Sequence, residues 1–407
     1  MPEVAEVRLI ADNLRDFLKD KYLLELHVMD PVKIEKWINR NCPGIKEFNQ
    51  RTKTYKYIKV IDVHTHGKFC YIECDNNIYI GISFGMSGNI RPEPTDSFLK
   101  VYRWKDKPIS KSEYLKHCHI AFKFLNDINT STKDIKDINT GDINTSDINT
   151  GDINTSDINT SDINTSDINT SDINTIYYHD IRRFGRFDFY YSKADLDKKL
   201  SKLGHDPLSH TTISNNDQIV QLFRKFNYQN ICKALMEQEL LAGVGNFIKS
   251  ETLYSAKISP YAIISNIPDT ALIDLYNAII KIAKDDYNFG GCSLYTFSGV
   301  QGDQSSFKDT LKVYNHEMEK DANGYFIRRI PENLSPDKRS TFWVPEIQII
   351  GVSPEKRLEE SSERSSSNSN KMADFVQNAE KSPEKKSIKI KHLKVLNILP
   401  RKITIIK

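Results

Sequence analysis

Residues 231–254 read ICKALMEQELLAGVGNFIKSETLY, and this stretch decides how the second half of the chain is interpreted. Apolar residues recur at helical spacing on both sides of its centre, where Gly243 and Gly245 let the backbone turn tightly. Asn246 then opens a second helix. The first backbone N–H groups of a helix point outward and favour an anion such as a phosphate. The stretch therefore predicts two helices joined by an anion-binding turn, although a plain helix–helix turn with glycine as punctuation has the same pattern.

Patterns on either side of this stretch set the fold class. An amphipathic helix is expected at the start, because apolar residues from Val4 to Leu18 fall at helical spacing and Pro2 suits a first turn. Strand-like runs follow it, namely YKYIKVIDVH, KFCYIEC, IYIGISF, HIAFKF, IYYHDI and RFDFYY. Helical patterns begin at Asn215, and the strand-like YFIRRI and STFWV come last. This order predicts an α+β chain of several domains.

Composition excludes several classes of protein. The chain has 407 residues, 39% of them hydrophobic, and a mean hydropathy of −0.52. Its apolar runs are far shorter than the ~20 residues of a membrane span, and the charges throughout residues 1–30 leave no room for a secretory signal. Six cysteines without a CxxC pair argue against a disulfide scaffold and a four-cysteine zinc site. We therefore expect an intracellular protein without a membrane partner.

Charge is distributed unevenly. Residues 127–175 carry −8, from ten Asp against two Lys, which leaves +11 for the rest of a chain whose net charge is +3. A core this basic favours a polyanionic partner, and nucleic acid is the leading candidate.

The chain starts Met1-Pro2-Glu3. Initiator Met is normally removed before a small residue, which is expected to leave Pro2 with a free secondary amine. An α-amino group titrates at about 8, and the positive end of a helix disfavours its protonated form. Such an amine is able to attack a sugar carbon or a carbonyl, and Glu3 stands beside it to move protons. Many helices also simply begin with Pro-Glu.

Residues 179–187, HDIRRFGRF, place two arginines and a phenylalanine at the end of a strand. Arginine bridges phosphates and phenylalanine wedges into a base stack. The same residues also suit a surface turn.

These motifs together resemble one known family. In order along the chain they are Pro2-Glu3, Lys56 in TYKYIKV, GMSG at 85–88, DIRRFG at 180–185 and AGVGN at 242–246. They resemble the Fpg/Nei family of formamidopyrimidine-DNA glycosylases and endonuclease VIII proteins, over most of residues 2–348 outside the repeat described below. The resemblance implies an N-terminal β-sandwich with a leading helix, a helix-two-turns-helix domain and a C-terminal finger.

The resemblance also implies an activity. The family consists of bifunctional DNA glycosylases/AP lyases of base excision repair, which form a Schiff base through the N-terminal proline and then cut the strand by β,δ-elimination. The expected partner is single- or double-stranded DNA with oxidised bases or abasic sites, bound by a monomer without a cofactor. The expected compartment is the nucleus or another that contains DNA.

Catalytic roles follow residue by residue. Pro2 resembles the nucleophile and Glu3 the general acid/base that opens the sugar ring. Glu6 matches a second glutamate near the site. Lys56 resembles the lysine that binds the phosphate beside the lesion, although residues 54–55 replace the arginines usual before it.

DNA-binding roles follow in the same way. Met86, Arg182 and Phe184 resemble the residues that fill the gap left by a flipped-out nucleotide. Arg183 resembles a phosphate contact, and Asn246 lies in the DNA-binding turn.

The finger departs from the common pattern of four zinc-binding cysteines. Residues 311–348 contain no cysteine, and KRSTFWV resembles the end of the finger, with Arg339 as the tip arginine. The segment is similar to the zincless finger of the endonuclease VIII-like branch, in which two strands keep the shape, and we predict no zinc. That branch favours oxidised pyrimidines and ring-opened or further oxidised purines. A preference for 8-oxoguanine is the alternative. Residues 292–309 are expected to hold the base-reading loop, and nothing in their sequence decides between the two preferences.

Two segments stand outside this scheme. One is an acidic repeat of DINT followed by Ser or Gly, expected to be disordered or a short β-helix. The other is a charged, Ser-rich tail, expected to be disordered. The expected domains are the catalytic β-sandwich (1–126 and 176–212), the insertion (127–175), the helix-two-turns-helix domain (213–308), the zincless finger (309–350) and the tail (351–407).

Two other functions fit parts of the sequence. Tautomerases also use an N-terminal proline, but they are much shorter and have no use for DIRRFG or AGVGN. A DNA-binding relative without activity is the second, and Pro2, Glu3 and Lys56 argue against it.

Overall fold

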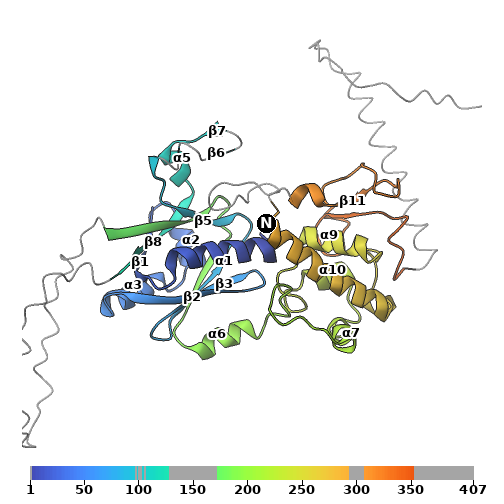
Figure 1. Ribbon diagram of the computed structural model, residues 1–407, viewed down its shortest axis with the longest axis horizontal. Coiled ribbons are helices and arrows are strands. Elements are labelled where there is room, and N and C mark those ends of the chain that lie inside the picture. Colours follow the sequence, from blue (N-terminus) through green and yellow to red (C-terminus); the bar gives the residue numbers. More distant parts are fainter. Residues whose placement is uncertain are drawn as a thin grey trace, which may run out of the picture. The chain divides into compact units, whose positions relative to one another are not determined.

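The first half of the chain folds into a sheet whose strands include every predicted run (Figure 1). The computed structural model describes residues 2–96, 99, 103–104, 107–127, 172–292 and 307–352. Within these residues, eight strands form a sheet in the order β10-β4-β3-β2-β1-β8-β9-β5. Their bounds are β1 Tyr22–Val28, β2 Ile58–His66, β3 Phe69–Cys74, β4 Tyr79–Ser83, β5 Gly88–Pro92, β8 Cys118–Leu125, β9 Ile173–Asp180 and β10 Arg186–Tyr190. The strands β1 and β5 were not predicted.

The sheet folds over on itself. Its two halves are joined by β1 and β2, which pair only at Tyr22↔Lys59 and Leu23↔Ile58. Phe122 of β8 and Phe187 of β10 are far apart in the strand order, yet their ring centroids are 6.1 Å apart. One apolar core therefore takes side chains from both halves, which confirms the predicted sandwich.

Helices close the edges of this sandwich. The predicted leading helix is α1 (Val4–Leu18), whose apolar side enters the core through Val7, Ile10, Leu14 and Leu18. Glu3 is its N-cap, so Pro2 lies one residue before the helix rather than in its first turn. The other helices and short strands of this region are α2 Glu35–Asn41, α3 Ile45–Thr54, α5 Lys111–Leu115, α6 Lys193–Leu200, β6 Arg103–Trp104 and β7 Lys107–Pro108.

The acidic repeat is inserted into a hairpin, as predicted. The strands β8 and β9 pair antiparallel from Cys118↔His179 to Leu125↔Ile173. The ladder extends into the last pentad, because β-branched Ile and Thr suit a strand. Residues 128–171 lie outside the described part of the chain, as do 353–407, so the expectations for the repeat and the tail are not tested.

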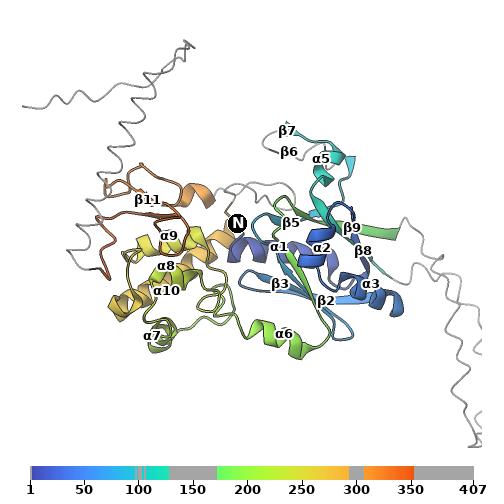
Figure 2. The ribbon, with the colours of Figure 1, turned by 180° about the vertical axis from the view of Figure 1, so that it is seen from behind.

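The helical domain has its own apolar core. Its helices are α7 Asn216–Arg224, α8 Ile231–Met236, α9 Asn246–Ser255 and α10 Asp269–Asn288, with the short 3-10 turn η3 Ile264–Asn266. The four helices confirm the predicted ones. Figure 2 shows α8 and α10 beside α9, which packs against both, and α1 of the sandwich also packs against α10.

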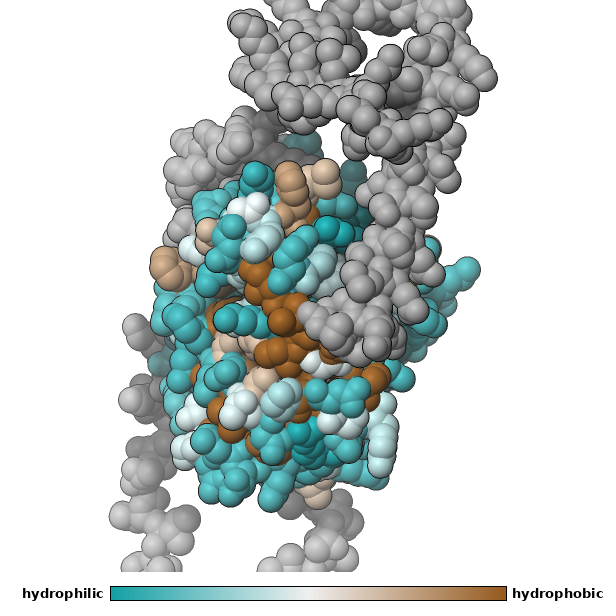
Figure 3. All heavy atoms as spheres, turned by 90° about the vertical axis from the view of Figure 1, so that its right-hand side faces the viewer, coloured by the Kyte–Doolittle hydropathy of each residue, from teal (hydrophilic) through white to brown (hydrophobic). Residues whose placement is uncertain are grey.

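A small hairpin closes the described chain. After η4 (Phe307–Thr310), β11 (Arg328–Ile330) pairs with β12 (Thr341–Trp343). Phe342 and Trp343 are buried, whereas Tyr325 and Phe326 are exposed and do not add to the packing expected of them. Figure 3 views the side of the helical domain and the finger, where hydrophobic residues reach the surface between hydrophilic ones.

Candidate functional site

Glu3 lies where the sandwich meets the helical domain. Its Oε1 accepts a hydrogen bond of 3.0 Å from the backbone N–H of Phe247, in the first turn of α9. Gly245 makes this approach possible, because an added Cβ there would lie 2.2 Å from Cδ of Glu3. The acceptor at this helix N-terminus is thus the carboxyl group of Glu3. The first turn of α9 was expected to bind a phosphate, and in this structure its donors are directed at Glu3 instead.

Two backbone turns complete the junction. The N–H of Val4 donates to the carbonyl of Gly243 over 3.1 Å. The turn between β2 and β3 packs against the same loop, since a Cβ on Gly67 would lie 2.5 Å from the carbonyl carbon of Ala242. Both glycines have positive φ, +58° at Gly67 and +105° at Gly243. These turns bring the start of the chain, a β hairpin and the AGVGN loop to one point (Figure 1).

The β2–β3 turn brings a partly buried lysine, Lys68, to this point. Nζ of Lys68 donates a hydrogen bond of 2.8 Å to the carbonyl of Val244. The negative charges of Glu3 and Glu6 both act on this ammonium group. Burial lowers the pKa of Lys68, and the negative charge of Glu3 opposes that shift.

Sequence reasoning chose a different lysine. Lys56 is exposed at the end of α3, before β2, whereas Lys68 follows β2. The nine residues of β2 extend over roughly 30 Å at about 3.3 Å per residue. The structure does not bring Lys56 to Glu3. The only local signal for Lys68 is a Gly-Lys turn between two apolar runs, and such turns usually face solvent.

Glu6 is the second buried carboxyl of the site. Its Oε2 accepts from the N–H of Glu3 over 2.8 Å, and its Oε1 accepts from the N–H of Cys292 over 2.7 Å. Burial raises the pKa of Glu3 to about 7, against the opposing charge of Lys68 and with the help of Glu6. Burial also raises the pKa of Glu6. A carboxyl that titrates near neutrality is suited to give and take protons.

Two turns bring together the predicted gap-filling residues. Met86 lies between β4 and β5, and Nη1 of Arg182, between β9 and β10, donates to its sulfur over 3.5 Å. Phe184 is 59% exposed. The turns touch directly, since a Cβ on Gly85 would lie 2.7 Å from the carbonyl carbon of Phe184.

A buried aspartate holds the second of these turns. Asp180 accepts hydrogen bonds from the N–H of Gly185 over 2.8 Å, from the N–H of Arg182 over 3.1 Å, and from the hydroxyl of Ser87. Arg183 follows with a φ of +57°, and its carbonyl accepts from Nδ2 of Asn41 over 3.3 Å. Sequence reasoning missed this supporting role of Asp180.

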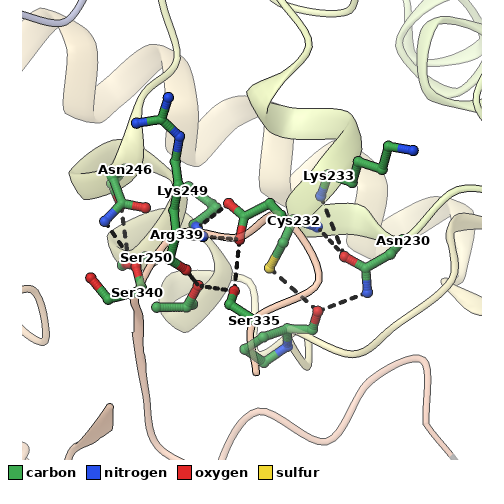
Figure 4. Close-up of polar contacts among 12 residues, drawn as sticks. Asn230, Cys232, Lys233, Asn246, Lys249, Ser250, Ser335, Arg339 and Ser340 are labelled. Carbon is green, nitrogen blue, oxygen red and sulfur yellow. Dashed lines mark hydrogen bonds and ion pairs between the residues drawn. The ribbon is translucent and has the colours of Figure 1, made fainter. Parts of the chain in front are cut away.

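The finger is anchored to α9 (Figure 4). Nδ2 of Asn246 donates to the carbonyl of Ser340 over 2.8 Å. Nζ of Lys249 contacts Oδ2 of Asp337 at 2.5 Å, and the two side chains are 0% and 2% exposed. Oδ1 of Asp337 accepts from the N–H of Arg339 over 3.3 Å, while the side chain of Arg339 is exposed and close enough to lower the pKa of Lys68. Asn246 and Arg339 thus belong to one finger-tip assembly.

Two kinds of feature are absent from the described residues. These residues contain no group of three or more His, Cys, Asp or Glu placed to hold a metal ion. None of their helices is both long and apolar enough to cross a membrane. The absence of zinc stays a prediction.

Comparisons with known proteins agree with this architecture. The family model of the formamidopyrimidine-DNA glycosylase N-terminal domain matches residues 1–140, and that of the formamidopyrimidine-DNA glycosylase H2TH domain matches residues 203–298. The formamidopyrimidine-DNA glycosylase of Lactobacillus helveticus is 28% identical over 175 residues, which are 42% of this chain and 61% of that protein. That of Ruthia magnifica is 32% identical over 170 residues, 42% of this chain and 60% of that protein. The chain therefore spans about 60% of the length of these curated relatives.

Solved structures share the fold. The complex between the Lactococcus lactis Fpg and DNA containing an abasic site has a TM-score of 0.59 at 20% identity, and covers 85% of this chain and 99% of that one. MutM in complex with DNA containing carbocyclic 8-oxo-G gives the same values.

Proposed function

This chain belongs to the Fpg/Nei family, and from that membership we propose that it is a bifunctional DNA glycosylase/AP lyase of base excision repair. The observation that carries the proposal is the carboxyl of Glu3, fixed next to Pro2 by the first turn of α9, with a pKa raised to about 7 by burial.

The reaction begins at Pro2. With Met1 removed, its neutral secondary amine attacks C1′ of the damaged nucleotide and the C1′–N bond to the base breaks, so that the base leaves with the bonding pair and takes up a proton. Glu3 protonates the ring oxygen of the sugar, which opens, and the amine loses its proton to give an iminium ion. No electrons are lost or gained.

Strand cutting follows from the iminium. It acidifies C2′, a base removes a C2′ proton, and the bond to the 3′ phosphate breaks. A second elimination expels the 5′ phosphate, and water releases the sugar remnant from Pro2. A carboxyl with a pKa of about 7 serves both proton donation and proton removal.

Lys68 replaces Lys56 in this proposal. It is partly buried and interacts electrostatically with Glu3 and Arg339, whereas Lys56 is exposed at the far end of β2. We assign to Lys68 the contact with the phosphate beside the lesion. Glu6 supports Glu3 through its bond to the Glu3 N–H.

The remaining residues hold distorted DNA. Extruding a nucleotide costs a few kcal/mol, least for damaged pairs. The gap left by the extruded nucleotide is filled by Met86, Arg182 and Phe184. The DNA backbone is contacted by Arg183, Asn246 and Arg339. Such phosphate contacts make binding strongly salt-dependent. Because the proposed substrate is DNA, we propose that the protein acts in a compartment that contains DNA, such as a nucleus.

Two lesion classes compete. We propose oxidised pyrimidines and ring-opened or further oxidised purines, because the segment with KRSTFWV lacks the zinc cysteines. An 8-oxoguanine preference is the second candidate, favoured by the shared fold with MutM on 8-oxo-G DNA. Residues 293–306, within the expected base-reading loop, lie outside the described chain. Excision rates on duplexes with 5-hydroxyuracil, formamidopyrimidine or 8-oxoguanine decide between the two.

Borohydride trapping on an abasic-site oligonucleotide tests the activity itself. We expect a covalent complex with the wild-type chain, processed to Pro2, and none with Pro2→Gly. Lys68→Ala is expected to lower the trapping rate at least tenfold, while Lys56→Ala serves as the matched control and stays near the wild type. No trapping together with intact, salt-sensitive DNA binding would identify a DNA-binding relative without activity.

A further inference from the structure

Asp286, near the end of α10, is a third buried carboxyl beside Glu3 and Glu6. It is 0% exposed, and neither of its oxygens accepts a hydrogen bond from a donor among the described residues. Its polar neighbours are Glu6, which is within hydrogen-bonding reach, and Glu3. An ionised carboxylate without donors or a positive partner is strongly disfavoured in the interior. Asp286 therefore has to be neutral or to share a proton.

The backbone decides which carboxyl of the pair keeps the proton. Both oxygens of Glu6 accept backbone N–H bonds, from Glu3 at 2.8 Å and from Cys292 at 2.7 Å. Such bonds stabilise the charged form, and Asp286 has none. Two ionised carboxylates in contact repel each other, whereas one proton between them makes an O–H···O bond. The proton therefore belongs on Asp286, and Glu6 accepts.

We propose that Asp286 is a positioning residue of this site, whose neutral carboxyl donates a hydrogen bond to the Glu6 carboxylate and so keeps Glu6 ionised beside Glu3. Burial raises the pKa of Asp286 to about 10, and the charges of Glu6 and Glu3 add to that shift. The ionised Glu6 in turn favours a protonated Glu3. The consequence for catalysis, a proton kept on Glu3 at neutral pH, rests on the proposed function.

Other ionisable groups around the cluster leave this arrangement intact. The charge of Lys68 in the β2–β3 turn interacts with Glu3, and the charge of Arg339 of the finger lowers the pKa of Lys68. The thiol of Cys292 stays neutral, because burial raises its pKa. Glu251 of α9 is occupied by backbone N–H groups that follow η4, at 2.7–2.9 Å. Among the described residues, the charged groups that act on the pKa of Asp286 are thus the two glutamates, and no positive group favours its ionised form.

Infrared spectra of the full chain with ¹³C-labelled aspartate test the proton directly. A protonated aspartic acid shows a carbonyl band that a carboxylate lacks. We expect this band at pH 8 in the wild type and its loss in Asp286→Asn. A wild-type spectrum without the band overturns the proposal, and this readout needs no DNA.

The coupling to Glu3 is tested by titrating ¹³C-labelled glutamate, with Glu3 assigned through Glu3→Gln. Asp286→Leu removes the donor, so Glu6 takes up a proton and the midpoint of Glu3 falls by on the order of 1 pH unit. Asp286→Asn keeps a neutral donor and rescues the midpoint to within a few tenths of a unit. Asp285→Leu, an exposed neighbour on α10, is the control and leaves the midpoint in place.

The outcomes separate this inference from the proposed function. If Asp286→Asn lowers the Glu3 midpoint as far as Asp286→Leu does, Asp286 is ionised and the proposal falls. An unchanged midpoint in Asp286→Leu also overturns it. If Asp286→Leu does not fold, the aspartate band and the isosteric Asp286→Asn decide alone. Failure of borohydride trapping, with the infrared results as expected, refutes the activity and leaves Asp286 as the proton carrier.

Discussion

The buried ion pair between Lys249 and Asp337 offers a sharp test of how the finger is held. The substitution Asp337→Asn keeps Oδ1, which accepts from the hydroxyl of Ser335 at 2.6 Å and from the N–H of Arg339 at 3.3 Å. It changes only the atom that faces Lys249, where a carboxylate oxygen 2.5 Å away becomes an NH₂ group. A fully buried ammonium then has no counter-charge.

The expected cost is large. Removing one partner of a buried pair destabilises by about 3–5 kcal/mol, because the other charge stays buried. At about 1.4 kcal/mol per factor of ten, hydrogen–deuterium exchange of the β11–β12 amides speeds up by roughly 10²- to 4 × 10³-fold, or until protection is lost. Asp197→Asn breaks an exposed pair with Lys193, whose side chains are 56% and 55% exposed. That control costs less than about 1 kcal/mol.

A double variant identifies the cause. Lys249→Met with Asp337→Leu removes both charges and fills the space with apolar atoms, which is often neutral or stabilising. It is expected to restore most of the protection of the finger. The reasoning is refuted if Asp337→Asn behaves like Asp197→Asn, or if the double variant is no better protected than the single one.

Three further predictions concern the site and the insertion. A carboxyl whose pKa rises on folding takes up protons on folding. The contribution of Glu3 to stability is therefore complete below its ordinary pKa of 4.5 and is lost as pH rises through about 7. Glu3→Gln should remove this loss of stability in urea titrations across pH 5–8, and should also abolish trapping. Gly245→Ala puts a Cβ 2.2 Å from Cδ of Glu3 and should lower trapping at least a hundredfold. Gly324→Ala strains a backbone with a φ of +84°, but its added Cβ meets no atom within 4 Å, so it should leave trapping near the wild-type level. Equal effects of the two variants would contradict the steric argument. Replacing residues 128–171 by a short turn should preserve folding and activity, because Leu125 and Ile173 are already paired. A circular dichroism spectrum of an unfolded chain would refute this.

Local patterns predicted most of the fold. The strand runs and the helices from α7 to α10 have strong periodicity, so burial of their apolar sides follows from the sequence. The strand β1 was missed because YLLELHV follows directly on the leading helix and continues its apolar pattern.

The site was predicted less completely, because it is made by contacts between distant segments. Glu3 and Glu6 were found from the start of the chain, and the turns of Met86 and Phe184 do meet. Lys68 was missed, because nothing within the β2–β3 turn shows that it docks on the AGVGN loop. The first turn of α9 was assigned to a phosphate, since its sequence cannot show that Glu3 faces its N–H groups.

The bonds around Glu3 and Glu6 also have a consequence for synthesis. Glu3 bonds to a residue 244 positions further along the chain, and Glu6 to one 286 positions further. At about 5–20 residues per second, the ribosome needs some tens of seconds to supply these partners. During that interval the first residues are accessible to processing enzymes, whereas in the folded chain Pro2 is buried. The removal of Met1 that the proposed mechanism requires is therefore expected to occur on the nascent chain, and a protein that folds with Met1 in place is expected to resist later trimming.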